Sequence, residues 1–170
     1  RRAALLKQND HLADRAMRVI GAAYKIVSGV DETEENLVFL GFAGLIDPPR
    51  EGVGKSIAKC RRAGIRTVMI TGDHKHTAAA IAKQVGILTE KERILTGAEL
   101  DRLSDQELSE AVKETAVFAR VTPAHKLRIV RAFRRNGQIT AMTGDGVNDA
   151  PAVKEADIGV SMGKSGTDVT

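Results

Sequence analysis

The sequence predicts an α/β protein built on a mostly parallel sheet. From about residue 37, short apolar runs alternate with amphipathic stretches of helical spacing, which is typical of parallel α/β sheets. Two of these apolar runs end in Thr-Gly-Asp, at 71–73 and 143–145. Of the 170 residues, 42% are hydrophobic and 28% are charged, as in ordinary globular proteins. This composition argues against a disordered chain.

Turn and capping residues indicate where the helices and strands begin and end. Two prolines after Asp47 end the first apolar run, because proline interrupts regular structure. Gly86 stands where a helix is expected to end. Ser104 and Glu107 form a capping box, and Thr122 precedes a proline at a first helical position. The expected helices cover 51–63, 75–85, 104–114, 122–137 and 149–156, and the expected strands cover 37–46, 65–70, 116–118, 138–142 and 157–162.

Residues 1–36 fit the alternating pattern less well. We expect a helix to about Ala16, a strand near 18–26 and an acidic loop before residue 37. The first 46 residues are therefore interpreted as the tail of a separate domain, with 47–50 as the linker. Because the chain opens without Met, we expect it to be a piece of a longer protein.

Charge and composition weaken several classes of function. The 26 Lys and Arg only slightly exceed the 22 Asp and Glu, and aromatic residues make up 3%, so binding of nucleic acid by base stacking is disfavoured. The basic clusters at 59–66 and 126–135 have helical spacing, which favours solvated faces. Cys60 is the single cysteine, which excludes a disulfide framework. No run approaches the roughly 18 apolar residues of a membrane span.

Both Thr-Gly-Asp turns are expected at the carboxyl end of the sheet, where doubly wound proteins bind ligands. The Thr71 hydroxyl and the backbone amides around Gly72 can hold a phosphoryl oxygen, as can helix N-termini. Asp145 and Asp149 can face one pocket, where two carboxylates repel each other unless a cation lies between them. Mg²⁺ takes one or two carboxylates together with waters and phosphate.

A turn or a helix cap is the alternative role for each of these residues, because Asp and Gly often serve only that purpose. For Asp73 alone the two interpretations weigh equally. For Asp145, Asn148 and Asp149 together a ligand site is favoured, because a cap needs only one of them.

Three basic residues are weaker candidates. Lys126 and Arg120 flank the turn at 119–126, where a cation would offset the charge of a phosphate. An ordinary surface lysine is an equal alternative for Lys126. For Arg18 a solvated arginine is favoured.

Four segments resemble, in order and spacing, the cytoplasmic catalytic segment of P-type cation-transporting ATPases, nearest to the calcium-pump branch. These segments are "DPPR" (47–50), "MITGDH" (69–74), "FARVTPAHK" (118–126) and "MTGDGVNDAP" (142–151). The resemblance implies a Rossmann-like, three-layer fold of the haloacid-dehalogenase (HAD) type. It also implies that 1–46 is the C-terminal part of a nucleotide-binding domain and 47–170 the later part of a phosphorylation domain.

The same resemblance implies a role for each matching residue. Thr71 would hold a phosphate oxygen, Lys126 would neutralise the phosphoryl group and Asn148 would hydrogen-bond the phosphate. Asp145 would bind Mg²⁺, with Asp149 supporting the metal site. The residues expected on the nucleotide side are Arg18, Asp47, Gly72, Asp73 and Arg120.

The sequence departs from this family in one respect. The family's phosphorylated aspartate lies in an Asp-Lys-Thr-Gly-Thr run, and this chain has none. The chain is therefore expected to use Mg²⁺ and ATP only together with the actuator and transmembrane parts of a pump, at the cytoplasmic face of a membrane. Without the strand that carries the nucleophile, an exposed sheet edge is expected to favour pairing between chains. A soluble HAD-type phosphatase, which predicts an Asp-x-Asp pair absent here, and a non-catalytic Mg²⁺- or nucleotide-binding module are the alternatives.

Overall fold

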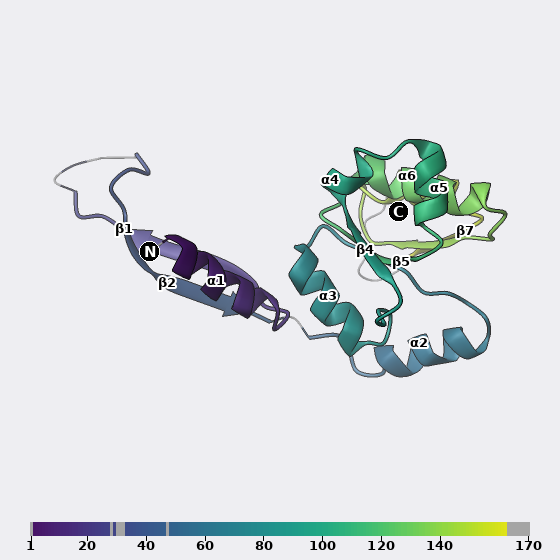
Figure 1. The fold of residues 1–170 in the computed structure, drawn as a ribbon, viewed down its shortest axis with the longest axis horizontal. Helices are drawn as coiled ribbons and strands as arrows, with labels where there is room; N and C mark the ends of the chain where they lie inside the picture. Colours follow the sequence, from purple (N-terminus) through teal and green to yellow (C-terminus); the bar gives the residue numbers. More distant parts are fainter. Residues whose placement is uncertain (1, 28, 30–32, 47, 163–170) are drawn as a thin grey trace.

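The computed structural model describes residues 2–27, 29, 33–46 and 48–162, and Figure 1 shows their course. An N-terminal lobe of one helix and two strands precedes a larger α/β body. The helices are α1 Arg2–Ala13, α2 Val53–Arg62, α3 Lys75–Gln84, α4 Gly97–Leu100, α5 Asp105–Ala111, α6 Pro123–Arg135 and α7 Ala150–Glu155. The strands are β1 Arg18–Tyr24, β2 Val38–Leu45, β3 Met69–Ile70, β4 Arg93–Thr96, β5 Thr115–Ala119, β6 Ala141–Gly144 and β7 Ile158–Ser161.

A parallel sheet with the strand order β3-β5-β4 forms the centre of the body. Every residue of β5 is buried, because helices cover both of its faces. Ile57 of α2 and Ala78 of α3 pack on one face, whereas Leu108 of α5 and Ile129 of α6 pack on the other. The predicted α/β class, the three layers and the parallel strands are confirmed.

Strands β6 and β7 form a second parallel pair. Met142 of β6 packs with Val130 of α6 and Ala152 of α7, and Ile70 of β3 packs against the same cluster. Helix α6 therefore serves both sheets. Among the described residues, β3 pairs only with β5 and β6 pairs only with β7, so each has one edge without a strand partner.

The helix boundaries confirm the predicted caps. Ser104 and Glu107 form the predicted capping box at α5. Thr122 caps α6, and Pro123 occupies its first turn. Gly86, two residues after the last residue of α3, has a φ of 81°, which favours glycine.

Several predicted elements differ from the observed ones. Only Met69–Ile70 of the strand predicted at 65–70 is paired; before it, Arg66 donates a side-chain hydrogen bond to the Thr115 carbonyl, where β5 begins. The strand predicted at 138–142 lies at 141–144. The Thr140 backbone N–H donates to the Asp157 carboxylate and is therefore not available for pairing with a strand. Helix α1 ends at Ala13, before the expected Ala16.

Strand β4 and helix α4 were not predicted. Each covers four residues, which is too short for a hydrophobic period to be recognised. Their positions depend instead on tertiary contacts, since Leu95 and Leu100 are buried in the core on the α5–α6 face.

The N-terminal lobe pairs β1 and β2 in an antiparallel ribbon, with α1 packed on β1. The expected strands near 18–26 and 37–46 are confirmed. Ile20 and Leu45, on the same face of the ribbon, are 52% and 50% exposed. The lobe contacts the body through the His76 ring, whose Nδ1 lies 2.6 Å from Asp14 Oδ1. Within the described ranges, no helix is both long and apolar enough to cross a membrane.

Candidate functional site

The loops that follow β3 and β5 are bonded together at the carboxyl end of the sheet. Thr71 N–H donates to the Phe118 carbonyl at 2.9 Å, and Val121 N–H donates to the Thr71 carbonyl at 3.2 Å. Arg120 N–H donates to the Asp73 carbonyl at 3.0 Å. These bonds hold the first Thr-Gly-Asp turn against the turn that carries Arg120, as expected for loops at one end of a parallel sheet.

The turn at 71–73 presents a hydroxyl, a carboxylate and an open backbone. Thr71 Oγ1 donates to Asp73 Oδ2 at 3.0 Å and accepts from the Asp73 backbone N–H at 3.1 Å. Asp73 is exposed, and Thr71 is half-buried. A Cβ added at Gly72 would meet no atom within 4 Å, so a ligand can approach the backbone there.

Lys126 and Asp149 form the most buried ion pair of the described structure. Lys126, in the first turn of α6, donates from Nζ to Asp149 Oδ1, and their side chains are only 18% and 10% exposed. Asp149 occupies the N-cap position of α7, yet its side chain makes no capping hydrogen bond. Asp149 therefore stands at the cap position of α7, but its carboxylate is directed to Lys126 and not to the backbone N–H groups of the helix.

Asp145 and Asn148 lie on the exposed turn between β6 and α7. The backbone enters this turn through Gly144, where an added Cβ would lie 2.6 Å from Asp149 Cβ. At Gly146 an added Cβ would meet nothing within 4 Å. In the described part of the chain, no hydrogen bond or ion pair occupies the Asp145 carboxylate. The turn thus exposes the side-chain oxygens of Asp145 and Asn148, which can act as metal ligands, next in sequence to the buried Asp149.

The donors at this turn fit a hard cation better than a transition metal. Carboxylate and amide oxygens suit Mg²⁺, which typically keeps waters and binds one or two carboxylates. No group of three or more His, Cys, Asp or Glu in the described ranges could hold a metal by itself. Asp145 remains available as a ligand, whereas Lys126 already engages one oxygen of Asp149.

Arg120 adds positive charge at the same sheet edge. Its φ of 54° is in the left-handed region, which is uncommon for a residue with a side chain and is concentrated at functional sites. Its side chain is exposed. Arg120 thus opens the loop between β5 and α6, and Lys126 follows in the first turn of α6.

Not every predicted residue joins this group. Arg18 lies on β1 in the N-terminal lobe and is exposed, and within the described part of the body no side chain forms a hydrogen bond or ion pair with it. Asp47 lies outside the described residues. Within the described ranges, no direct hydrogen bond or ion pair links Thr71 or Asp73 to Lys126 or Asp149. Thr71 and Asp73 follow β3 of the central sheet, whereas Asp149 follows β6 of the second parallel pair, and no bond between described residues joins the two pairs.

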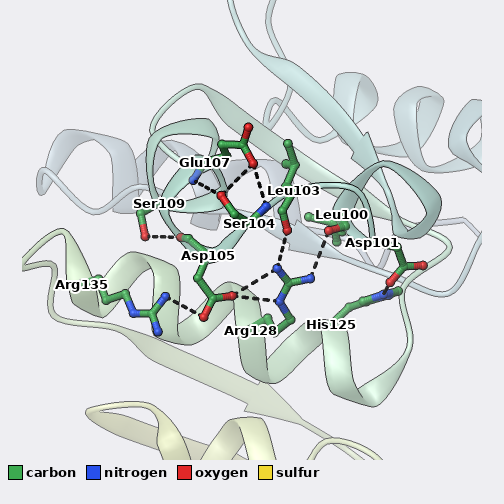
Figure 2. Close-up of polar contacts among 10 residues, drawn as sticks. All are labelled: Leu100, Asp101, Leu103, Ser104, Asp105, Glu107, Ser109, His125, Arg128 and Arg135. Atoms are coloured by element: carbon green, nitrogen blue, oxygen red, sulfur yellow. Dashed lines mark hydrogen bonds and ion pairs between the residues drawn. The ribbon is translucent and has the colours of Figure 1, made fainter.

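A polar network anchors α6 behind this edge, and Figure 2 shows its members. Arg128 donates to Asp105 and to the carbonyls of Leu100 and Leu103. The Arg135 guanidinium, followed by that of Arg128, holds the pKa of Asp105 below its usual value through hydrogen bonds and charge. The helix that carries Lys126 is thus tied to α4 and α5.

His125 belongs to this network, although it was not among the predicted site residues. It completes the Thr122 capping box, in which its ring Nδ1 accepts the Thr122 backbone N–H. The ring, however, is buried rather than on the surface. The signal in the sequence was its place at the third helical position, directly before Lys126.

A hollow of about 910 Å³ lies elsewhere, between β4 and α5, and is lined by residues that include Arg93, Ser104 and Glu110. None of the predicted site residues lines it. Its wall mixes both signs of charge, since arginine and lysine side chains line it together with glutamates. We therefore place the candidate site at the carboxyl sheet edge.

The chain is similar over almost its whole length to much longer pumps. It is 54% identical over 164 residues to a calcium-transporting ATPase of Bacillus subtilis. The aligned region covers 94% of this chain and 18% of the relative. It is 45% identical over 178 residues to a probable cation-transporting ATPase F of Mycobacterium tuberculosis, covering 99% of this chain and 20% of the relative. The chain thus spans about a fifth of the length of these curated relatives. A family model described as haloacid dehalogenase-like hydrolase matches residues 4–157, and the chain, with its parallel α/β body, belongs to that family.

Proposed function

We propose that this chain is a cytoplasmic catalytic segment of an ATP-driven, P-type cation pump, and that the cation is calcium. The observation that carries this proposal is the buried Lys126–Asp149 ion pair, with the exposed Asp145 and Asn148 on the turn that leads to Asp149. The similarity to relatives named as calcium-transporting ATPases supports the pump and the cation. Residues 1–46 would belong to the nucleotide-binding domain and 47–170 to the phosphorylation domain.

The proposed chemistry is the formation and hydrolysis of an aspartyl phosphate. Mg²⁺, when bound, supplies charge neutralisation for the transferred phosphoryl group. Asp145 would hold that ion, and Asn148 and Thr71 would donate hydrogen bonds to phosphate oxygens. Lys126 would offset phosphate charge, with Asp149 keeping its ammonium in place and supporting the metal site.

Nucleotide binding is assigned to residues at the rim of this edge. Arg120, Asp73 and the open backbone of Gly72 lie on the bonded loops after β3 and β5. Arg18 on the N-terminal lobe and Asp47 between the two parts would approach the nucleotide from the other side. ATP is thus proposed as the substrate, and the actuator and transmembrane parts of the same polypeptide as partners at the cytoplasmic face of the membrane.

The nucleophile is proposed to come from another part of that polypeptide. Covalent phosphoryl transfer needs an attacking carboxylate, and the family's Asp-Lys-Thr-Gly-Thr run does not occur in this chain. Among the described residues, β3 and β6 each have one edge without a strand partner and both pack with α6, so these edges suit one further parallel strand. A soluble phosphatase of the same family would need an Asp-x-Asp pair of its own, which this chain lacks.

The test uses the full-length protein that contains this chain, in membrane vesicles. We expect ATP to label the protein covalently with phosphate when calcium is present, and we expect ATP-driven calcium uptake. The Asp145→Ala variant is expected to abolish labelling, whereas Glu90→Ala, an exposed carboxylate on the loop after α3, is expected to preserve it. Labelling stimulated by a different cation would refute the calcium assignment alone. Absence of labelling with every cation would refute the pump.

A further inference from the structure

The short segment Thr96–Asp101 contacts the loop between β5 and α6, which precedes Lys126. Gly97, the first residue of α4, lies so close to this loop that an added Cβ would be 2.3 Å from the Arg120 carbonyl oxygen and 3.0 Å from His125 Cε1. A side chain cannot be placed there without moving the loop. The close approach of α4 therefore depends on glycine, although the backbone of Gly97 is not in a left-handed conformation.

A second contact is made by the His125 ring, which is 7% exposed. Its Nδ1 accepts the Thr122 backbone N–H at 3.1 Å, and its Nε2 lies 2.8 Å from Asp101 Oδ1. Because Nδ1 accepts, the ring proton is assigned to Nε2, which donates to the carboxylate. Figure 2 shows this ring joining the end of α4 to the start of α6.

Helix capping alone does not account for this arrangement. A capping box needs only one acceptor at the third helical position, and Nδ1 already serves that purpose. The second nitrogen is directed at a carboxylate of another element, 24 residues earlier in the chain. The ring is therefore fixed from both sides at the residue directly before Lys126.

We propose that His125 is a positioning residue, through which Asp101 and the closely packed Gly97 fix the first turn of α6 so that Lys126 reaches Asp149. The proposal rests on the proposed function in that Lys126 is taken to act on a phosphoryl group. The contact that the proposal explains, the Lys126–Asp149 ion pair, is present in the structure whatever the function of Lys126 is.

The structure offers a matched control on the same helix. Asp105 also joins an upstream element to α6, through Arg128 and Arg135, and its side chain is 55% exposed compared with 66% for Asp101. Figure 2 shows that Asp105 contacts α6 through these two arginines and Asp101 through His125. Loss of Asp105 should weaken the attachment of α6 without releasing the loop before Lys126.

The experiment is a double-mutant cycle on the 170-residue chain, with Lys126→Met and Asp149→Asn as the two changes and urea unfolding as the measurement. The cycle yields the coupling between the two side chains. We expect this coupling to fall by about half or more in an Asp101→Ala background. It should be retained in Asp101→Asn, which keeps an acceptor oxygen, and in the control Asp105→Ala. An unchanged coupling in Asp101→Ala would overturn the proposal.

NMR of the His125 ring nitrogens and of the Lys126 ammonium gives a second readout that does not require Asp149 to be replaced. We expect the Nε2–H tautomer of His125, and a shift of the Lys126 Nζ resonance in Asp101→Ala but not in Asp101→Asn or Asp105→Ala. The Nδ1–H tautomer, or an unmoved Nζ resonance, contradicts the proposal. These results do not depend on phosphate labelling of the full-length protein, so failure of the proposed function and failure of the positioning role are distinguishable.

Discussion

Lys126 and Asp149 are 23 residues apart in sequence and form an ion pair with little exposure to solvent. The pair joins the first turn of α6 to the N-cap residue of α7, and so connects the helix after β5 to the turn after β6. Removing one partner of such a pair leaves the other charge buried without compensation.

Lys126→Met is therefore expected to lower the free energy of unfolding by about 3 kcal/mol. The double variant Lys126→Met with Asp149→Asn should recover much of that loss, because no uncompensated charge remains buried. Urea unfolding of the parent chain, the Lys126→Met variant and the double variant measures both effects. A double variant less stable than Lys126→Met would contradict this explanation.

Two glycines of the same turn form a matched pair. Gly144→Ala would place a Cβ 2.6 Å from Asp149 Cβ and 2.8 Å from Val153 Cγ2, so about 1–3 kcal/mol of stability should be lost to overpacking. Gly146→Ala meets open space, and its effect should stay within about 0.5 kcal/mol. Thermal and urea unfolding of the two variants test this difference, and equal effects would show that the close approach at Gly144 is unimportant.

Acid is expected to destabilise the fold through a set of hydrogen-bonded carboxylates. The pKa values of Glu99 and Glu107 are lowered from 4.5 by hydrogen bonds from Thr96 and Ser104, and that of Asp105 is lowered from 3.8, first by Arg135 and then by Arg128. Because the folded pKa values lie below the unfolded ones, their stabilisation is present above about pH 4.5 and is lost as the pH falls through the folded values.

Arg135→Gln should flatten this acid dependence, because it removes the largest cause of the lowered pKa of Asp105. Arg102→Gln, a change at an exposed arginine, serves as the control. The midpoint of urea unfolding, measured from neutral pH to below pH 3.8, gives the slope of stability against pH for each variant. The prediction is wrong if both variants keep the slope of the parent chain.

The unpaired edges of β3 and β6 are expected to make the isolated chain associate, because open strand edges pair with other chains. Light scattering should give a mass that rises with concentration. Thr143→Lys, at an exposed position of β6, should reduce this rise, whereas Thr89→Lys on an exposed loop should not. A monomer at every concentration would contradict the prediction.

The purified chain is expected not to hydrolyse ATP, since no Asp-Lys-Thr-Gly-Thr nucleophile is present. Phosphate release in the presence of Mg²⁺ and ATP measures this directly. Hydrolysis that disappears in Asp145→Ala would mean that the chain contains its own attacking group, and the proposed division of the site would then be incorrect.

Helix ends could be predicted from the sequence because they depend on neighbouring residues. The Ser104 and Thr122 caps, with the glycine at 86, are local features, and the structure confirms them. The extent of β3 and β6 could not be predicted in this way. A strand is paired only where its partner is present, and the ends of both strands are set by β5 and by the Asp157–Thr140 contact.

The sequence by itself determined the α/β class, the order of most elements, the placement of Thr71, Asp73 and Asp145 in turns after strands, and the place of Asp149 at the start of a helix. Only the tertiary structure decided that Asp149 is paired with Lys126 while Asp145 stays exposed, and that His125 joins Asp101 to the loop before that lysine. The physical reason is that these contacts join segments more than twenty residues apart. They form only when the packing of α4, α6 and α7 brings the segments together.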